Sequence, residues 1–202
     1  MKKIVLAAIA VVGFGVTGFA QQQVKFGPKA GVNFSNISGY DDAEMLTGFH
    51  VGAVAEIKFN EKFSIQPEVV YSAQGAKRER NTSFATFEGK QKLDYINVPI
   101  MAKYYIVNGF SVEAGPQVGF LVKAEEDVNG TINGVSIGDK TDNKDSFNSV
   151  DFGVNFGLAY DLPQGFFVNA RYNLGLSDVI KDNADDAVKN NVIQVGVGYK
   201  FD

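Results

Sequence analysis

The chain has no cysteine, no tryptophan and only one histidine, His50, among its 202 residues. Without cysteine it cannot form disulfides, a thiolate nucleophile or a Cys-ligated metal site. A single histidine also excludes a His-rich metal centre, so we predict no cofactor and no metal. The formal net charge of −4 argues against nucleic acid as a partner, because nucleic-acid binding favours a basic face. Beyond the first twenty residues, no stretch is apolar enough for a membrane-spanning helix.

The first twenty residues have the pattern of a secretory signal peptide. Lys2 and Lys3 precede an unbroken apolar run, residues 4–16, and small residues at Gly18 and Ala20 are followed by three glutamines. We predict that residues 1–20 are a signal peptide cleaved after Ala20, and that residues 21–202 form one exported domain. The alternative is an uncleaved membrane anchor.

What the chain does contain is a period of two, repeated eight times. Apolar and polar residues alternate in runs that each predict a strand with one apolar face. No position on the apolar face of any run carries a charge. The runs are 24–35, 49–59, 63–74, 96–106, 110–124, 150–160, 166–176 and 193–201.

The connections between these runs alternate between short and long. Residues 60–62, 107–109 and 161–165 are short, and Asn108-Gly109 is a strong hairpin signal. Residues 36–46, 75–91, 125–148 and 177–190 are long and polar. This pattern with an even strand number predicts an all-β fold, an eight-stranded antiparallel up-and-down transmembrane β-barrel in the outer membrane of a Gram-negative-type cell. Both termini fall on the short-turn side, which would be periplasmic.

The apolar face is predicted to lie outside, against outer-membrane lipid. An eight-stranded barrel has an interior just wide enough for side chains or one small ligand, so it cannot hold the apolar side chains of all eight runs. The opposite face is rich in glycine, which suits a crowded concave side. Phenylalanine and tyrosine gather near both ends of the runs, as the two membrane interfaces favour.

The predicted interior carries many charges. Isolated buried charges are very costly, so we expect these residues to pair. The inward positions are Lys25, Lys29, Lys58, Lys103, Lys123, Arg171 and Lys200, with Glu56, Glu68, Glu113, Asp151 and Asp161. The expected lumen network comprises Lys29, Glu56, Glu68, Lys103, Glu113, Asp151 and Arg171. It is interpreted as a polar plug that fixes strand register, with a selectivity-lined pore as the alternative.

Pro28, Pro67, Pro99 and Pro116 fall within the predicted strands. Every strand of a closed barrel is central, so each proline removes a ladder donor. We therefore expect β-bulges at these positions.

Candidate sites other than the lumen charge network are weak, including His50, which is expected to face inward near the outer end of its strand. His50 lies near Asp41 and Asp42 in sequence, but no serine is placed beside it, so we predict a rim histidine and no catalytic residue. The loop 125–148 is acidic. Calcium is one interpretation, but regular ligand spacing is missing, which favours a solvated loop extending partly as a hairpin. The basic loop 75–91 is predicted to be solvated, to bind lipopolysaccharide phosphates or to pair with loop 125–148.

Several segments resemble the PorT-like outer-membrane β-barrel proteins over essentially the whole mature chain. They are residues 28–33, 66–68, 95–104, 115–116, 151–153 and 171–176. Asn97 departs from the family, which usually has an acidic residue there. The resemblance implies no catalytic set, and its name-giving member is implicated in protein secretion. The ending Tyr199-Lys200-Phe201-Asp202 is similar to the terminal signal read by barrel-assembly machinery; the alternative is that Phe201 is only a girdle aromatic.

The function predicted from sequence is non-enzymatic. It is a structural or interaction role through four long surface loops, as an accessory of secretion or surface assembly. Expected partners are outer-membrane lipid, the barrel-assembly machinery and an envelope protein contacted by the loops. A small pore, a ligand-binding barrel and a barrel enzyme are the competing hypotheses.

Overall fold

The computed structural model describes residues 23–38, 44–81, 85–132, 135–181 and 187–201. The predicted signal peptide, residues 1–20, lies outside the described residues, as do Asp41 and Asp42. The described part forms nine strands and one short 3₁₀ helix. They are β1 Gln23–Ser38, β2 Glu44–Lys58, β3 Phe63–Asn81, β4 Ala85–Val107, β5 Phe110–Ile132, β6 Val135–Asp142, η2 Lys144–Ser146, β7 Val150–Asp161, β8 Phe166–Gly175 and β9 Lys189–Tyr199.

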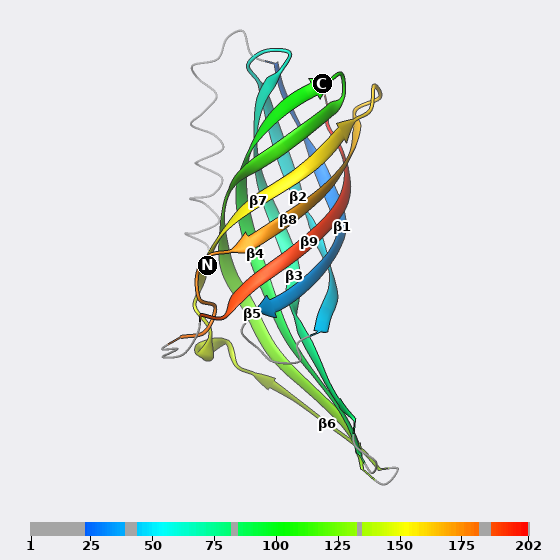
Figure 1. Ribbon diagram of the computed structural model, residues 1–202, viewed down its shortest axis with the longest axis vertical. Coiled ribbons are helices and arrows are strands. Elements are labelled where there is room, and N and C mark those ends of the chain that lie inside the picture. The colour runs from blue at the N-terminus through cyan, green and yellow to red at the C-terminus, as the bar shows by residue number, and fades with distance from the viewer. Residues whose placement is uncertain (1–22, 39–43, 82–84, 133–134, 182–186, 202) are drawn as a thin grey trace.

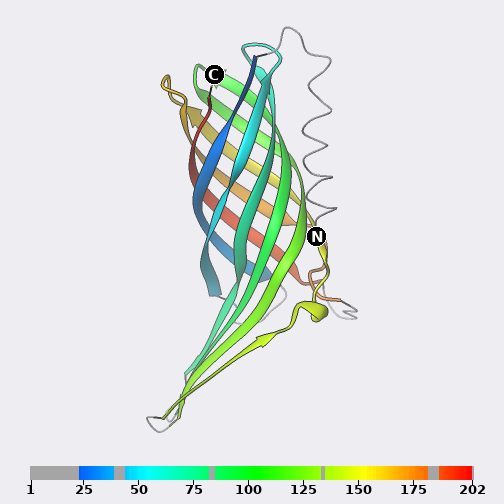
Figure 2. The same cartoon turned by 180° about the vertical axis from the view of Figure 1, so that it is seen from behind.

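Eight of these strands close into an antiparallel barrel, which confirms the predicted fold class (Figures 1 and 2). The sheet order is β4-β3-β2-β1-β9-β8-β7-β5-β6, and an additional pairing of β4 with β5 closes the ring. The ninth strand, β6, pairs with β5 alone among the described strands and lies outside the ring. Within the described residues, no helix has the length and apolar character needed to cross a membrane.

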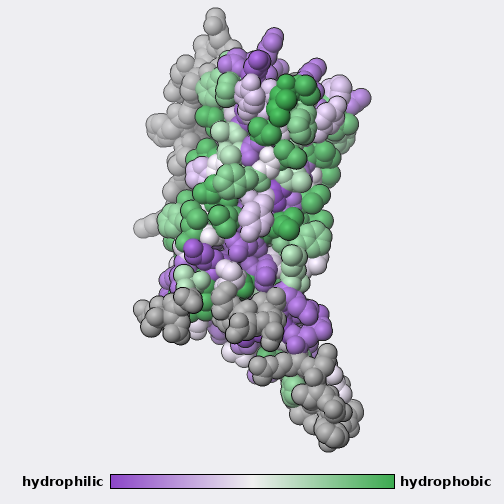
Figure 3. Space-filling model, viewed as in Figure 1, coloured by the Kyte–Doolittle hydropathy of each residue, from purple (hydrophilic) through white to green (hydrophobic). Residues whose placement is uncertain are grey.

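Every barrel strand presents a row of apolar side chains on its outer face, and the charged residues of the interior lie on the opposite face. Phe156 and Val197 are 52% and 58% exposed, whereas the inward Lys29 is 2% exposed. In Figure 3 hydrophobic side chains cover most of the visible barrel wall, and hydrophilic ones gather toward its ends. This surface is suited to hydrocarbon, because a barrel buried in lipid presents its apolar residues outward.

The expected bulges at the four prolines are not present. The β3–β4 register is the same on both sides of Pro67, and the β5–β7 ladder runs through Pro116 without a shift. The β1–β2 and β4–β5 registers likewise keep the same offset across Pro28 and Pro99. A proline removes one N–H donor but adds no residue, so a ladder can lose a bond there and keep its register.

A register shift occurs instead beside Lys123. Asp94 of β4 lies opposite Lys123 of β5, but the next residue, Tyr95, lies opposite Leu121. The extra residue in β5, Val122, reverses the side-chain parity beyond it. Lys123 is therefore 54% exposed and pairs with Glu125, and Ala124 is buried inward. The predicted luminal position of Lys123 and outward position of Ala124 are wrong for this reason.

The two longest predicted loops are largely strand. β3, β4 and β5 run past the barrel rim, and β6 adds a fourth strand beside β5. The hairpin predicted for 125–148 is thus present as β5 and β6. We call the four-stranded sheet of residues 76–81, 85–92, 125–132 and 135–142 the arm; it projects obliquely from one end of the barrel (Figures 1 and 2).

The other end of the barrel carries the short turns. Asn108-Gly109 joins β4 to β5, and Gly109 adopts a φ of 82°, which glycine tolerates without strain. The first residue of β1 and the C-terminal end of the chain lie at this end too, in keeping with the predicted up-and-down order (Figure 1).

Candidate functional site

The middle of the lumen holds a buried ion-pair network drawn from four strands. Arg171 of β8 donates to Glu68 of β3, with 2.6 Å between Nη2 and Oε1, and also pairs with Glu113 of β5. Lys29 of β1 lies 3.0 Å from Glu68 Oε2. The side chains of these four residues are at most 1% exposed. Each charge has an opposite charge beside it, which offsets its desolvation.

A second network lies nearer the short turns. Glu56 of β2 pairs with Lys200 and accepts a hydrogen bond from Ser64 at 2.6 Å. Asp161 of β7 lies 2.9 Å from Lys200 and 3.6 Å from Lys103 of β4. The Tyr105 hydroxyl contacts Glu56 and lies 2.7 Å from Asp161 Oδ2.

One glutamine joins the two networks. Gln66 donates to Glu68 at 2.7 Å and accepts from the Lys103 ammonium at 3.3 Å. Six of the seven residues expected in the lumen network therefore meet in one connected system. The seventh, Asp151, is buried closer to the arm and accepts a hydrogen bond from Ser177 at 2.6 Å. Within the described part of the chain, Asp151 forms no ion pair or side-chain hydrogen bond with the other six residues.

His50 is buried in the lumen beside amide side chains. Its Nδ1 lies 2.8 Å from the amide oxygen of Asn33, which also accepts a hydrogen bond from Gln194. The Asn33 amide nitrogen donates in turn to Ser72. His50 is thus held by amide groups, and in the described ranges its ring forms no hydrogen bond to a serine or carboxylate, although Ser72 lies opposite it in the β2–β3 register. Such an arrangement lacks the nucleophile–base pair that acyl-transfer chemistry requires.

The barrel end that carries the arm is covered by two loop segments. Phe147, Val179, Ile180 and Val188, which we call the cap, pack on inward-facing apolar residues of the barrel wall, including Leu93, Tyr95 and Leu121. Hydrogen bonds join the two segments: the Lys181 backbone N–H donates to Ser146 O at 3.0 Å, and the Asn148 side-chain Nδ2 donates to Asp178 O at 2.8 Å. This small core could not be recognised from the sequence, because its residues are scattered over long, polar connections.

One face of the arm is a lattice of alternating charges. Lys77 pairs with Glu79 and lies 3.4 Å from Glu88. Lys92 and Lys140 lie 3.2 and 3.6 Å from Asp127. The Lys90 hydrogen bond lowers the pKa of the Glu88 carboxyl, and the Lys92 hydrogen bond lowers the pKa of Asp127. Segments 75–91 and 125–148 meet through the β4–β5 backbone ladder. The ion pairs of Lys77 and Lys90 stay within segment 75–91 and that of Lys140 stays within segment 125–148, so the expected charge pairing between the two segments stays a prediction.

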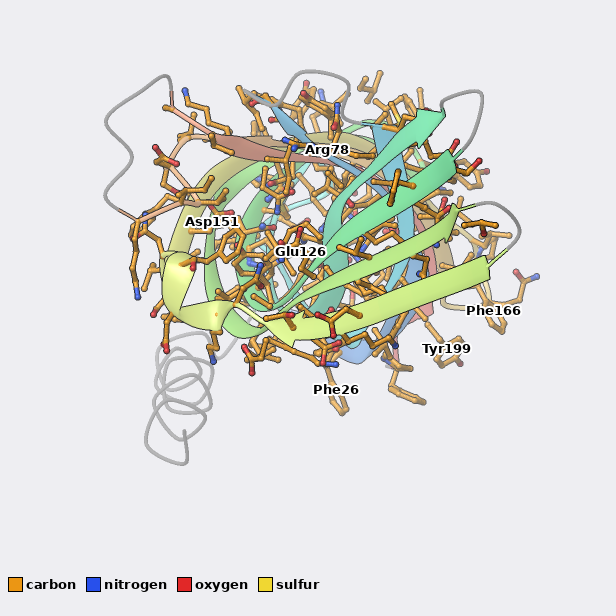
Figure 4. All side chains as sticks on the ribbon, turned by 90° about the horizontal axis from the view of Figure 1, so that it is seen from below. Phe26, Arg78, Glu126, Asp151, Phe166 and Tyr199 are labelled. Atoms are coloured by element: carbon orange, nitrogen blue, oxygen red, sulfur yellow. The ribbon has the colours of Figure 1, made fainter. Side chains whose placement is uncertain are left out.

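The opposite face of the arm continues the luminal face and overhangs the barrel mouth. Arg78, Gly89, Gln91 and Glu126 lie on it, and together with Ile37 and Ala76 they line a small pocket of about 90 Å³. Seen from the arm end, Arg78, Glu126 and Asp151 fall within the ring of strands (Figure 4). Among the described residues, no cluster of His, Asp and Glu side chains is suited to hold a metal ion.

Aromatic rings gather around the short-turn end. Phe166 and Tyr199 stack edge to face with centroids 4.9 Å apart, and Tyr199 contacts Phe201 at 5.0 Å. Phe26, Phe166 and Tyr199 point away from the barrel (Figure 4). Phe201 donates its backbone N–H to Phe26 O at 2.8 Å, so the two residues of the expected assembly signal flank the seam where the first and last strands meet.

Comparisons with known proteins agree with this architecture. The model of one protein family, described as an outer membrane protein beta-barrel domain, matches residues 19–181. No curated protein matches the chain. Among solved structures, Neisserial surface protein A (NspA) is 16% identical, with 89% of this chain and 99% of that chain covered and a TM-score of 0.52. Ail, the attachment invasion locus protein of Yersinia pestis, is 17% identical over 89% of this chain and 99% of its own, with a TM-score of 0.47.

Proposed function

Because the chain belongs to the outer membrane protein beta-barrel domain family, we propose that it is a non-enzymatic surface protein whose barrel anchors the arm in the outer membrane. In this proposal the arm contacts another protein of the cell envelope. The role is structural or interaction-based, as an accessory of secretion or surface assembly, in line with the resemblance to PorT-like barrels.

The observation that carries this proposal is the continuity of the arm with the barrel wall. β3, β4 and β5 each pass from barrel to arm as one strand, and the ion pairs of Lys77, Lys92 and Asp127 brace the part outside the barrel. A sheet built this way holds its position relative to the membrane. A fixed position favours a surface that binds a partner over a loop that only connects two strands.

The interior supports the same proposal over a pore or a ligand-binding barrel. The Arg171 network crosses the lumen between strands that lie far apart in the ring, and the cap covers the arm end. Ions or ligands would have to break buried ion pairs to pass. The polar plug is thus the favoured interpretation of Lys29, Glu56, Glu68, Lys103, Glu113, Asp151 and Arg171. The amide environment of His50 likewise speaks against an enzyme.

The remaining parts of the proposal concern export and orientation. Residues 1–20 would direct export and be removed, and the barrel-assembly machinery would read Tyr199 and Phe201. Both termini would then be periplasmic, with the arm outside the cell. The exposed rings of Phe26 and Phe201 at the seam support a role for this end in assembly.

The test is site-specific cross-linking in intact cells. A photoreactive residue replaces Val128, which is 38% exposed on the arm, and the matched control replaces Val168, which is 45% exposed on the barrel wall. We expect a discrete envelope-protein adduct from position 128 and no such adduct from position 168. Identical patterns from both positions, or no protein adduct from the arm, would contradict the interaction role.

A further inference from the structure

The outermost strand of the arm, β6, has one unpaired edge. Its eight residues pair with β5 alone among the described strands, at one constant register. In Figures 1 and 2 β6 runs along the margin of the arm. An open strand edge offers a row of backbone N–H and C=O groups to another chain. We call this side of residues 135–142 the β6 edge.

The hydrogen bonds next to β6 show which backbone groups face this edge. Asn143, directly after β6, donates its N–H to Ala124 O of β5 at 3.3 Å. Hydrogen-bonding direction alternates along an antiparallel strand, so residues 137, 139 and 141 also bond to β5. The N–H and C=O groups of residues 136, 138, 140 and 142 therefore face the β6 edge.

The β6 edge lacks the features that commonly block the addition of a strand. Residues 135–142 contain no proline, and their pairing with β5 contains no bulge. A lysine can guard an open edge, but the Lys140 ammonium lies 3.6 Å from Asp127 of β5 and so pairs within the arm. The Lys140 N–H donates to Asp139 Oδ1 at 2.9 Å, whereas the N–H of Gly138 points to the open edge.

The exposed carboxylates beside the β6 edge have no positive partner. Asp139 and Asp142 accept hydrogen bonds from nearby backbone N–H groups and form no ion pair in the part of the chain that the structure describes. Asp139 lies opposite Val128 and Asp142 opposite Glu125, so the two carboxylates lie on opposite faces of the arm. A strand added here would meet negative charge on both faces. Opposite charges across a strand pair are favourable, which favours a basic strand.

We propose that the β6 edge binds an extended, basic segment of an envelope protein, which adds to the arm as a fifth strand. Backbone hydrogen bonds would supply affinity, and lysine or arginine beside Asp139 and Asp142 would supply selectivity. A second copy of this chain offering its own β6 edge would instead bring carboxylates together, which is unfavourable. The inference rests on the proposed interaction role of the arm and specifies the chemistry of its partner.

The first measurement uses residues 21–202 in phosphatidylcholine nanodiscs with two synthetic ten-residue peptides. One alternates threonine with lysine, and the other alternates threonine with glutamate. Amide hydrogen exchange of the protein is followed by NMR. The lysine peptide should protect the N–H groups of Gly138 and Asp142 and change those of Asp139 and Thr141 little, because the latter already bond to β5. The glutamate peptide should not bind, and high salt should weaken the lysine peptide.

Variants of β6 separate the backbone from the charge. Gly138→Pro removes one edge-facing N–H and keeps the bonds to β5, since proline is tolerated where the N–H of an edge strand faces outward. It should weaken the lysine peptide at least fivefold, whereas Gly138→Ala should bind like the wild type. Asp139→Asn/Asp142→Asn should also weaken binding at least fivefold. The matched control Glu44→Gln/Glu61→Gln removes two exposed carboxylates away from β6 and should leave binding unchanged.

The second measurement repeats the cross-linking in intact cells with the photoreactive residue in place of Val128. Gly138→Pro should abolish the envelope-protein adduct, and Gly138→Ala should retain it. The cross-linked segment of the partner, identified by mass spectrometry, should carry a net positive charge.

Four results would overturn the inference. They are no protection of β6 by the lysine peptide, equal binding of the two peptides, full binding by Gly138→Pro, and an adduct that is a second copy of this chain. An envelope-protein adduct that survives Gly138→Pro would also exclude the β6 edge but leave the interaction role of the arm standing. The absence of any adduct from the unaltered arm would contradict that role and the inference with it.

Discussion

Lys29, Glu68 and Arg171 are separated widely in sequence, yet the barrel brings them within hydrogen-bond distance in its interior. Their outward neighbours along the same strands are uncharged. At the scale of single residues, the side that a residue faces therefore decides what a substitution costs. A charged side chain is tolerated in the lumen only beside an opposite charge, and the outer face of the barrel wall must carry no charge.

Val154 tests the outward side. It lies on the outer face of β7 between Pro116 and Leu174, near the middle of the strand. We expect Val154→Arg to destabilise the barrel by ~2–4 kcal/mol, since arginine at the bilayer midplane is costly. The measurement is urea unfolding in liposomes. Val128→Arg, the same change on the arm, is the control and should have little effect; equal stability of the two variants would contradict the outward assignment.

Glu68 tests the inward side. Glu68→Gln leaves Lys29 without its carboxylate and removes one of the two carboxylates that contact Arg171. We expect a loss of about 3–5 kcal/mol in the free energy of unfolding, the usual cost of an uncompensated buried charge. Glu79→Gln breaks an exposed ion pair on the arm and should cost about 0–1 kcal/mol. A result in which both variants unfold alike would exclude the buried network as a source of stability.

At the scale of elements, the eight barrel strands could be predicted because burial by lipid imposes strict alternation. The arm could not, because residues 77–92 and 125–142 carry charged and polar residues on both faces and lack a continuous apolar face. These strands are determined by pairing between β3, β4, β5 and β6. Such pairing cannot be recognised from a single segment of the sequence. The bulge at Val122 could not be predicted either, because the alternation of apolar residues continues through it.

Within the site, the alternation of residues along each strand predicts which of the network residues face the lumen, Lys123 excepted, but not how they group. Arg171 contacts both Glu68 and Glu113, and Asp151 instead accepts from Ser177. These choices depend on strand stagger around the ring. The cap was also hidden, because Phe147 and Val179 meet only after two connections fold together.

The arm is predicted to loosen in acid. The pKa values of Glu88 and Asp127 are lowered in the folded arm by hydrogen bonds from Lys90 and Lys92. A carboxyl with a lowered folded-state pKa contributes stability above its unfolded pKa, and this is lost as the pH falls through the folded value. Amide hydrogen exchange, corrected for intrinsic rates, should show less protection of residues 86–92 and 125–131 below about pH 4 than at pH 7. Barrel strands serve as the internal control; unchanged arm protection would argue against the charge lattice.

At the scale of the whole molecule, an apolar wall surrounds a lumen that holds buried ion pairs, and the arm projects from one end. In the proposed function the wall anchors the arm, and neither ligand binding nor ion flow through the lumen is required. The family match places this architecture in the outer membrane, and NspA shares the fold.

Planar bilayers test the plugged lumen. We expect no stable unitary currents from the wild-type protein, because the Arg171 network and the cap both block the path. Arg171→Ala is the informative comparison, because it removes the side chain that links Glu68 and Glu113 across the lumen. Stable wild-type currents that disappear when Glu68 or Arg171 is altered would instead identify a selectivity-lined pore.

The most direct measurement is sedimentation of residues 21–202, refolded in detergent and then transferred to plain buffer. A wall of exposed side chains such as Phe156 and Val197 should drive aggregation once the amphiphile is removed, and adding it back should restore a monodisperse species. A folded chain that stayed monodisperse without any amphiphile would show that this surface does not face hydrocarbon.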